Sequence, residues 1–371
     1  MRAEYASDTV TRSSGTERVR SIDALRTIMC AGIAVNHFTP YFFSGQDSEL
    51  QVARYLSYFT DIFAVLAGLF TSPYLAQRWT GAGYFRFLVT RTARLYPLHV
   101  FTMSFYAVLA VPILLGVLTP ENADRYDLAA VPAHLTLTHA WGVGPVMALN
   151  YPSWMISAIF GCYLILPAIS MLVRRVRWAM MLVLAGALAL SYAFAWSLDR
   201  EVTSLQREGF GIMRVLPSFV FGLLLGQAKI HGGKAGSSLL FLAGMIVACA
   251  TPSPLEGASR FALIYTLVYA VLRMDKAQVA TPFNLAVLQS AGKLSFGVYL
   301  WHGLVATVLY RIVLPRALDT SLIRVGDVHP MFAYGLIAAG VAVAFVLAAI
   351  SLRTIEPYGA ALFRRAVGAR G

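Results

Sequence analysis

Charged residues are scarce in this sequence. Only 13% of its 371 residues are Asp, Glu, Lys or Arg, about half the fraction that soluble proteins carry. Apolar residues make up 58%, and long apolar runs recur along the whole chain. This composition excludes a soluble globular protein and predicts a polytopic membrane protein. Acids are the rarer charged class, and we attribute the net charge of +12 to cytoplasmic loops, so no nucleic-acid partner is expected.

Cysteine is also rare. The three cysteines, Cys30, Cys162 and Cys249, all lie in apolar segments, and an odd number at such positions does not predict a disulfide framework. The sequence lacks the pattern of a cleavable signal peptide, because the N-terminal segment is polar and the first apolar run is long and contains charges.

The apolar runs predict an all-α protein with about ten transmembrane helices. Lys and Arg concentrate on the side that holds both chain ends, which places both termini in the cytoplasm. We expect a cytoplasmic N-terminal tail over residues 1–19, a transmembrane domain over 20–358 and a basic cytoplasmic tail over 359–371. The predicted spans are 22–43, 55–77, 96–118, 150–173, 178–197, 211–228, 237–252, 259–273, 286–313 and 330–353.

Two parts of this arrangement are expected to be irregular. Gly292, Lys293 and Ser295 lie inside the ninth span and predict a break there, with Lys293 close to the cytoplasmic mouth. We expect the longest outer loop, about 120–149, to re-enter the membrane or to cover a cavity. It holds Pro132, His134, His139, Trp141, Gly142 and Gly144. The dipeptide Glu356–Pro357 predicts the end of the tenth span.

The first span contains three ionisable residues, Asp23, Arg26 and His37. Arg26 and His37 are eleven positions apart, so they share a helix face about 16 Å apart along the axis. Charges inside a membrane span usually face the protein interior or a wet cavity, so the stripe predicts a polar track. Asp23 is about 21 Å from His37 along the helix, too far to orient its ring directly.

Each group has a structural alternative. Asp23 and Arg26 are equally explained as an ion pair that anchors the helix end. His37 lies deep in the span, and imidazole is the natural proton carrier near neutral pH, so we assign it a catalytic role.

A second basic site begins the third span. Arg91 and Arg94 are neighbours on one helix face, and two guanidiniums side by side suit a phosphate group. The alternative is an anchor that follows the positive-inside rule. Arg26 lies at the same side of the membrane and would extend the pair to three arginines. His99, on the same helix, is expected to be a packed or water-bonded residue and not a catalyst.

Further polar and aromatic residues lie in later spans. Trp154 and Tyr163 suit an interface belt, whereas Arg214 is an intramembrane charge. His302, in the ninth span, is either a helix-packing hydrogen bonder or a site residue. We assign substrate contacts to these four residues.

These motifs, in this order, resemble the acyltransferase-3 family of integral membrane acyltransferases, which modify sugars and other acceptors in bacterial envelopes and natural products. The resemblance covers nearly all of residues 20–358. It rests on Asp23 with the Arg26 and His37 pair, the Arg91 and Arg94 pair, and the segments DIFAVLAGLF, NYPSWMISAIFGCYLILP, RVLPSFVFG, LSFGVYLWH and IEP. The sequence departs from the family pattern at Ile159, where a glutamate is usual.

The resemblance implies a membrane-embedded acyltransferase that uses acetyl-CoA or another acyl-CoA and no metal. Arg91, Arg94 and Arg26 would bind the donor phosphates, and His37 would act as general base on a hydroxyl of a carbohydrate or glycolipid acceptor, with Asp23 holding an arginine in place. The expected location is the inner membrane of a bacterium, as a multi-pass protein in contact with lipid, and oligomers are possible. A secondary transporter and a non-catalytic binding protein remain the alternatives.

Overall fold

The computed structural model describes residues 19–44, 47–117, 122–175, 178–233, 236, 256–317 and 329–368, and all secondary structure in these ranges is helical. The all-α prediction is therefore confirmed. Large apolar side chains are exposed on the outer helices, among them Leu114, Leu182 and Val346, as expected for a surface that faces lipid. Within the described residues, six helical segments are long and apolar enough to cross a membrane: Ser48–Ala76, Gly81–Leu114, Tyr151–Arg175, Ala179–Ser197, Ala286–Val313 and Pro330–Arg353.

Three more helices occupy the places of predicted spans. Helix α1 is Arg20–Phe38, α8 is Gly211–Gln227 and α10 is Glu256–Lys276. The predicted seventh span, 237–252, lies outside the described residues, as do Cys249 and most of the N-terminal tail. Ten spans and cytoplasmic termini therefore stay predictions. Cys30 and Cys162 are buried free thiols, as the sequence indicated.

The prediction placed the start of the third span too late in the sequence. Helix α4 is Gly81–Leu114, so it begins fifteen residues before the predicted start at residue 96. Thr80 caps its first turn by accepting a hydrogen bond from the Gly83 amide at 3.1 Å. The charges of the first half, including Arg91 and Arg94, hid this part of the helix from a hydropathy argument.

The predicted break in the ninth span is confirmed. Helix α11 (Ala286–Ala291) is followed by a 3-10 turn at Gly292–Leu294, by α12 (Ser295–Val305) and by a π-helical stretch at Ala306–Val313. The turn packs on α1 so closely that a Cβ on Gly292 would lie 2.4 Å from the carbonyl oxygen of Asp23. Thr27 also donates to the Leu288 carbonyl at 2.7 Å. The broken helix thus holds the charged end of α1.

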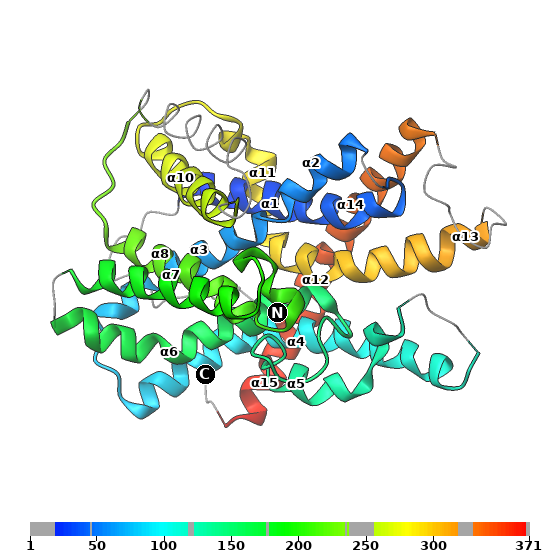
Figure 1. Cartoon of the computed structure of the whole chain (residues 1–371), viewed down its shortest axis with the longest axis horizontal. Coiled ribbons are helices and arrows are strands. Elements are labelled where there is room, and N and C mark those ends of the chain that lie inside the picture. Colours follow the sequence, from blue (N-terminus) through cyan, green and yellow to red (C-terminus); the bar gives the residue numbers. More distant parts are fainter. Residues whose placement is uncertain are drawn as a thin grey trace, which may run out of the picture.

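The last helices change the expected C-terminal boundary. Helix α14 (Pro330–Arg353) ends before Glu356–Pro357, as predicted, but α15 (Ile355–Ala366) follows at once. Residues 359–366 of the predicted tail are therefore helical. Figure 1 shows α15, in red, beside α4, and the two helices meet where the rings of Phe363 and Tyr96 lie 5.2 Å apart.

Helix α3 (Phe59–Thr71) and α8 cross at backbone contact. A Cβ on Gly68 would lie 2.0 Å from the Phe219 carbonyl oxygen, and one on Gly222 would lie 2.0 Å from that of Val65. Small residues permit such an approach between membrane helices. Figure 1 shows α8 beside α6 (Trp154–Arg175) and α7 (Ala179–Ser197). This packing brings the ends of α1, α3, α6 and α8 around one cavity.

Candidate active site

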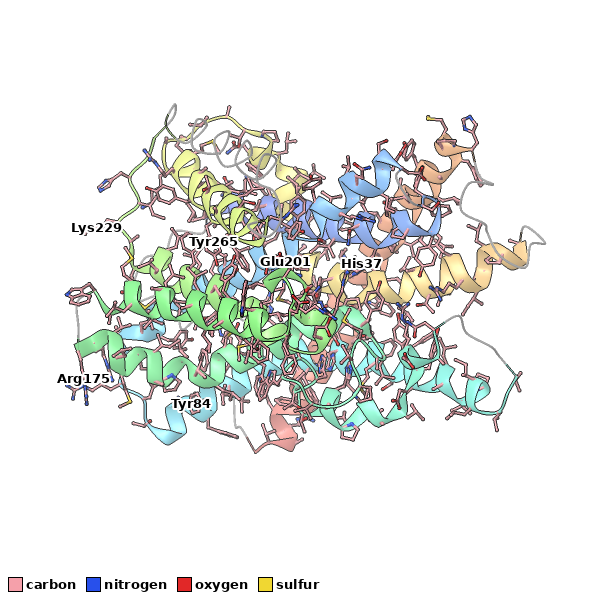
Figure 2. The ribbon with its side chains drawn as sticks, viewed as in Figure 1. His37, Tyr84, Arg175, Glu201, Lys229 and Tyr265 are labelled. Carbon is pink, nitrogen blue, oxygen red and sulfur yellow. The ribbon has the colours of Figure 1, made fainter. Side chains whose placement is uncertain are left out.

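A cavity of about 280 Å³ lies at the His37 end of α1. Figure 2 shows His37 and Glu201 in the middle of the molecule, whereas Arg175 and Lys229 lie at its edge. The walls come from α1, the start of α3, the segment before α6, the 3-10 segment Val202–Glu208 and α8. The lining residues are Ile33, Asn36, His37, Ser57, Tyr58, Thr60, Met147, Tyr151, Trp154, Glu201, Thr203, Ser204, Gln206, Arg207 and Arg214.

The structure brings His37 and His302 together, although they are 265 positions apart. Their rings stack with centroids 5.0 Å apart and an angle of 30°. The Tyr151 ring meets His37 edge-on at 5.2 Å. Neither ring nitrogen of His302 has a hydrogen-bond partner among the described residues. The ring is fully buried and does not line the cavity, so it reaches the cavity only through its contact with His37. The site predicted around His37 therefore contains a second imidazole, that of His302.

Arg214 belongs to the same cavity, but its charge is already paired. Its Nη2 lies 2.7 Å from the Asp61 carboxylate, and its Nη1 donates to the Thr203 carbonyl at 2.6 Å. The guanidinium also lies 5.5 Å from the ring centroid of Trp154. Both charges are almost fully buried, and removing one would leave the other uncompensated. Arg214 thus fixes α8 to α3 and to the cavity wall.

The sequence reasoning missed the cavity's carboxylate. Ile159, where the resemblance called for a glutamate, packs against the hydrophobic core and does not line the cavity. Glu201 lies in the cavity wall instead, from the segment between α7 and α8. No motif in the sequence analysis singled out Glu201. Asn36, one residue before His37, was likewise missed.

The predicted donor site lies at the other end of α1. Arg26 and Asp23 form an ion pair at 3.5 Å, and Arg94 is close enough to act on the Arg26 charge. Glu356 of α15 also faces Arg94, whose charge opposes the rise in pKa that burial imposes on the Glu356 carboxyl. Arg26 and Glu356 therefore both lie near Arg94, whose side chain is exposed.

Arg91 is held differently. Its guanidinium lies 5.6 Å from the ring centroids of Tyr74 and Phe87 and 6.0 Å from that of Tyr163. It also donates to the Phe70 carbonyl at 3.5 Å. Tyr163 is thus part of the Arg91 environment, and it does not line the cavity with Trp154, Arg214 and His37.

Arg26 and His37 consequently belong to two separate sites at opposite ends of α1. The cavity lining contains His37 but none of Arg26, Arg91 and Arg94. The cationic site and the imidazole site share the α1 helix and lie about 16 Å apart along its axis.

The expectation that His99 is packed is confirmed. It is fully buried and its Nε2–H donates to the His134 carbonyl at 3.1 Å. His134 and His139 lie against it, and burial lowers the pKa of His139 to about 3, with the nearby His99 as a second cause. These three rings form a cluster that is separate from His37 and His302.

Comparison with protein families matches residues 19–351 to a family described as an acyltransferase domain, acyltransferase-3. This match covers all the elements that build the cavity, together with Arg26, Arg91 and Arg94. No curated protein and no solved structure matches the chain.

Proposed function

Because the chain belongs to the acyltransferase-3 family of membrane acyltransferases, we propose that it transfers an acetyl group from acetyl-CoA to a hydroxyl of a carbohydrate or glycolipid acceptor. The observation that carries the proposal is the stacked pair of His37 and His302 beside a polar cavity. We propose the bacterial inner membrane as its location.

The donor binds at the cationic end of α1. Arg94 lies near enough to Arg26 for their charges to interact, and guanidinium groups bind phosphate oxygens with charge-assisted hydrogen bonds. Arg91 stabilises this end through its aromatic surroundings. The extended pantetheine arm follows α1 for about 16 Å and delivers the thioester to His37.

The acceptor binds in the cavity. Glu201, Asn36 and Gln206 offer hydrogen-bond partners for sugar hydroxyls, and Trp154 offers an apolar ring face. The Arg214 guanidinium stays paired with Asp61, so it shapes this wall without contributing a free charge.

The chemistry is general-base acyl transfer. His37 removes the proton of the acceptor hydroxyl while the hydroxyl oxygen attacks the thioester carbonyl carbon. The C–S bond of the thioester then breaks. The products are an ester and a thiolate, and the thiolate leaves as the free thiol after it takes up the proton. A positioned general base typically contributes about 10²–10⁴-fold.

Thiol release tests the proposal. Purified protein in detergent is given acetyl-CoA and a bacterial glycolipid extract, and free thiol is measured together with acetylated products by mass spectrometry. His37→Ala is expected to lose about 10²–10⁴-fold in rate. His231→Ala is the matched control, because His231 is exposed and lies outside the cavity. Flux of acetyl-CoA or an anion into liposomes without thiol release would support a transporter instead.

A further inference from the structure

Three buried histidines meet outside the proposed active site. His99 comes from α4, His134 from α5 (Val131–Leu135) and His139 from the loop that follows. Ring nitrogens of all three lie within 4.8 Å of one another. The rings are nearly parallel, and the centroids of His134 and His139 are 3.8 Å apart.

Each ring has one nitrogen left over. His99 donates its Nε2–H to the His134 carbonyl, and His139 Nε2 lies 3.2 Å from the Ser153 hydroxyl. The Nδ1 atoms of His99, His134 and His139 are buried and have no hydrogen-bond partner among the described residues. Unpaired buried polar atoms are uncommon and point to something that satisfies them.

A metal ion satisfies this set better than a water molecule does. A neutral imidazole that donates through Nε2 presents Nδ1 only as an acceptor. One water can donate to two such atoms, whereas a cation accepts three lone pairs at once. The partners of Nε2 also match the usual outer shell of a metal site, where the second ring nitrogen donates to a carbonyl or a similar oxygen.

We propose that His99, His134 and His139 form a binding site for a divalent transition-metal ion, for which Zn²⁺ is the best fit. Imidazole ligands suit zinc, and no carboxylate or thiolate joins the three rings within the described part of the chain, which disfavours calcium and magnesium. In tetrahedral geometry with Zn–N distances of about 2.0–2.1 Å, the ring planes of three ligands diverge, whereas the three rings here are nearly parallel. The rings therefore turn toward the ion when it binds, and the fourth position is left to water.

The site would act on the wall of the active-site cavity. Ser153, the partner of His139, lies between Tyr151 and Trp154, which both line the cavity. An ion that links α4 to the segment carrying His134 and His139 would hold this segment in place. The role is positioning, because none of the three histidines lines the cavity.

Metal content tests the proposal independently of catalysis. The full chain is purified in detergent without chelator, incubated with Zn²⁺, desalted and analysed by mass spectrometry of the metal. We expect about one zinc per chain in the wild type and less than about a tenth of that in His134→Gln and His139→Gln. Glutamine retains a donor near Nε2 and so preserves the outer hydrogen bond. His231→Gln, the control at an exposed position, is expected to keep the ion.

A second measurement separates loss of the ion from loss of the fold. Zinc is expected to raise the melting temperature of the wild type by about 3 °C or more and to leave that of His139→Gln unchanged. Replacement by Co²⁺ should give the visible absorption of a tetrahedral nitrogen site. A monodisperse wild-type protein that binds neither Zn²⁺ nor Co²⁺, or a variant set in which His231→Gln loses as much metal as His139→Gln, would overturn the site.

Discussion

His302 is placed so that its ring meets His37 while both of its nitrogens stay without a partner in the described structure. From the sequence, His302 was either a helix-packing hydrogen bonder or a site residue with a substrate contact, and its position beside His37 was not predicted. The stack on His37, the proposed base, allows two functions for His302. Either its flat ring positions the His37 ring, or one of its nitrogens binds substrate or exchanges a proton.

Replacement of His302 by Phe separates these functions. Phenylalanine keeps a flat ring against His37 but removes both nitrogens. If a nitrogen is needed, kcat falls by about 10-fold or more, while the KM for acetyl-CoA, which depends on the other end of α1, stays the same. Steady-state kinetics of thiol release measure both values, and wild-type kcat would limit His302 to packing.

Glu201 leads to a second prediction at this scale. As a hydrogen-bond acceptor in the cavity, it should contribute to acceptor binding, so Glu201→Gln is expected to lower acceptor kcat/KM by about 10-fold without changing the KM for acetyl-CoA. Glu208→Gln is the matched control, because Glu208 ends the same segment and pairs with the exposed Arg200. Equal effects of the two variants would remove Glu201 from the acceptor site.

At the scale of the elements, the crossing of α3 and α8 holds two walls of the cavity together. Gly222→Ala would place a methyl group 2.0 Å from the Val65 carbonyl oxygen, and overpacking of this kind costs about 1–3 kcal/mol. A lower melting temperature in detergent is the expected result. Gly186→Ala in α7 is the control, because a Cβ there meets nothing within 4 Å. Equal melting temperatures for both variants would show that the crossing tolerates separation.

The long α4 helix makes a prediction about the donor. Arg94 meets Arg26 and Glu356 at the cationic end, whereas Arg86 is exposed two turns earlier on the same helix. Arg94→Gln is expected to raise the KM for acetyl-CoA by about 10-fold, the loss of one charge-assisted hydrogen bond, with Arg86→Gln close to wild type. If both variants raise KM alike, the effect is general surface charge.

Helix type and order were within reach of the sequence, because apolar runs of membrane length leave few alternatives. The start of α4 was not, since the charges of Arg91 and Arg94 delay the beginning of the apolar run until after the helix has begun. The break at Gly292 was predicted from glycine and polar residues inside a span. The partner of this break, the backbone at Asp23, was not predicted, because it is set by tertiary contacts that no local sequence pattern encodes.

The site shows the same division. His37, Arg26 and Arg94 could be singled out because charge inside or beside a membrane span is unusual. The contacts that decide their roles are long-range. Each of these contacts joins segments that are far apart in the sequence. Arg214 pairs with Asp61, and His302 stacks on His37. Glu201 lines the same cavity as His37.

For the whole molecule, the central claim is that one donor molecule spans the two ends of α1. A structure of the purified chain in lipid with coenzyme A bound tests this most directly. The account predicts phosphate groups within hydrogen-bond distance of Arg94 and Arg26, and the thiol sulfur beside His37 and His302. Coenzyme A with its phosphates in the His37 cavity, or with its thiol on another face of α1 and out of reach of His37, would contradict the account.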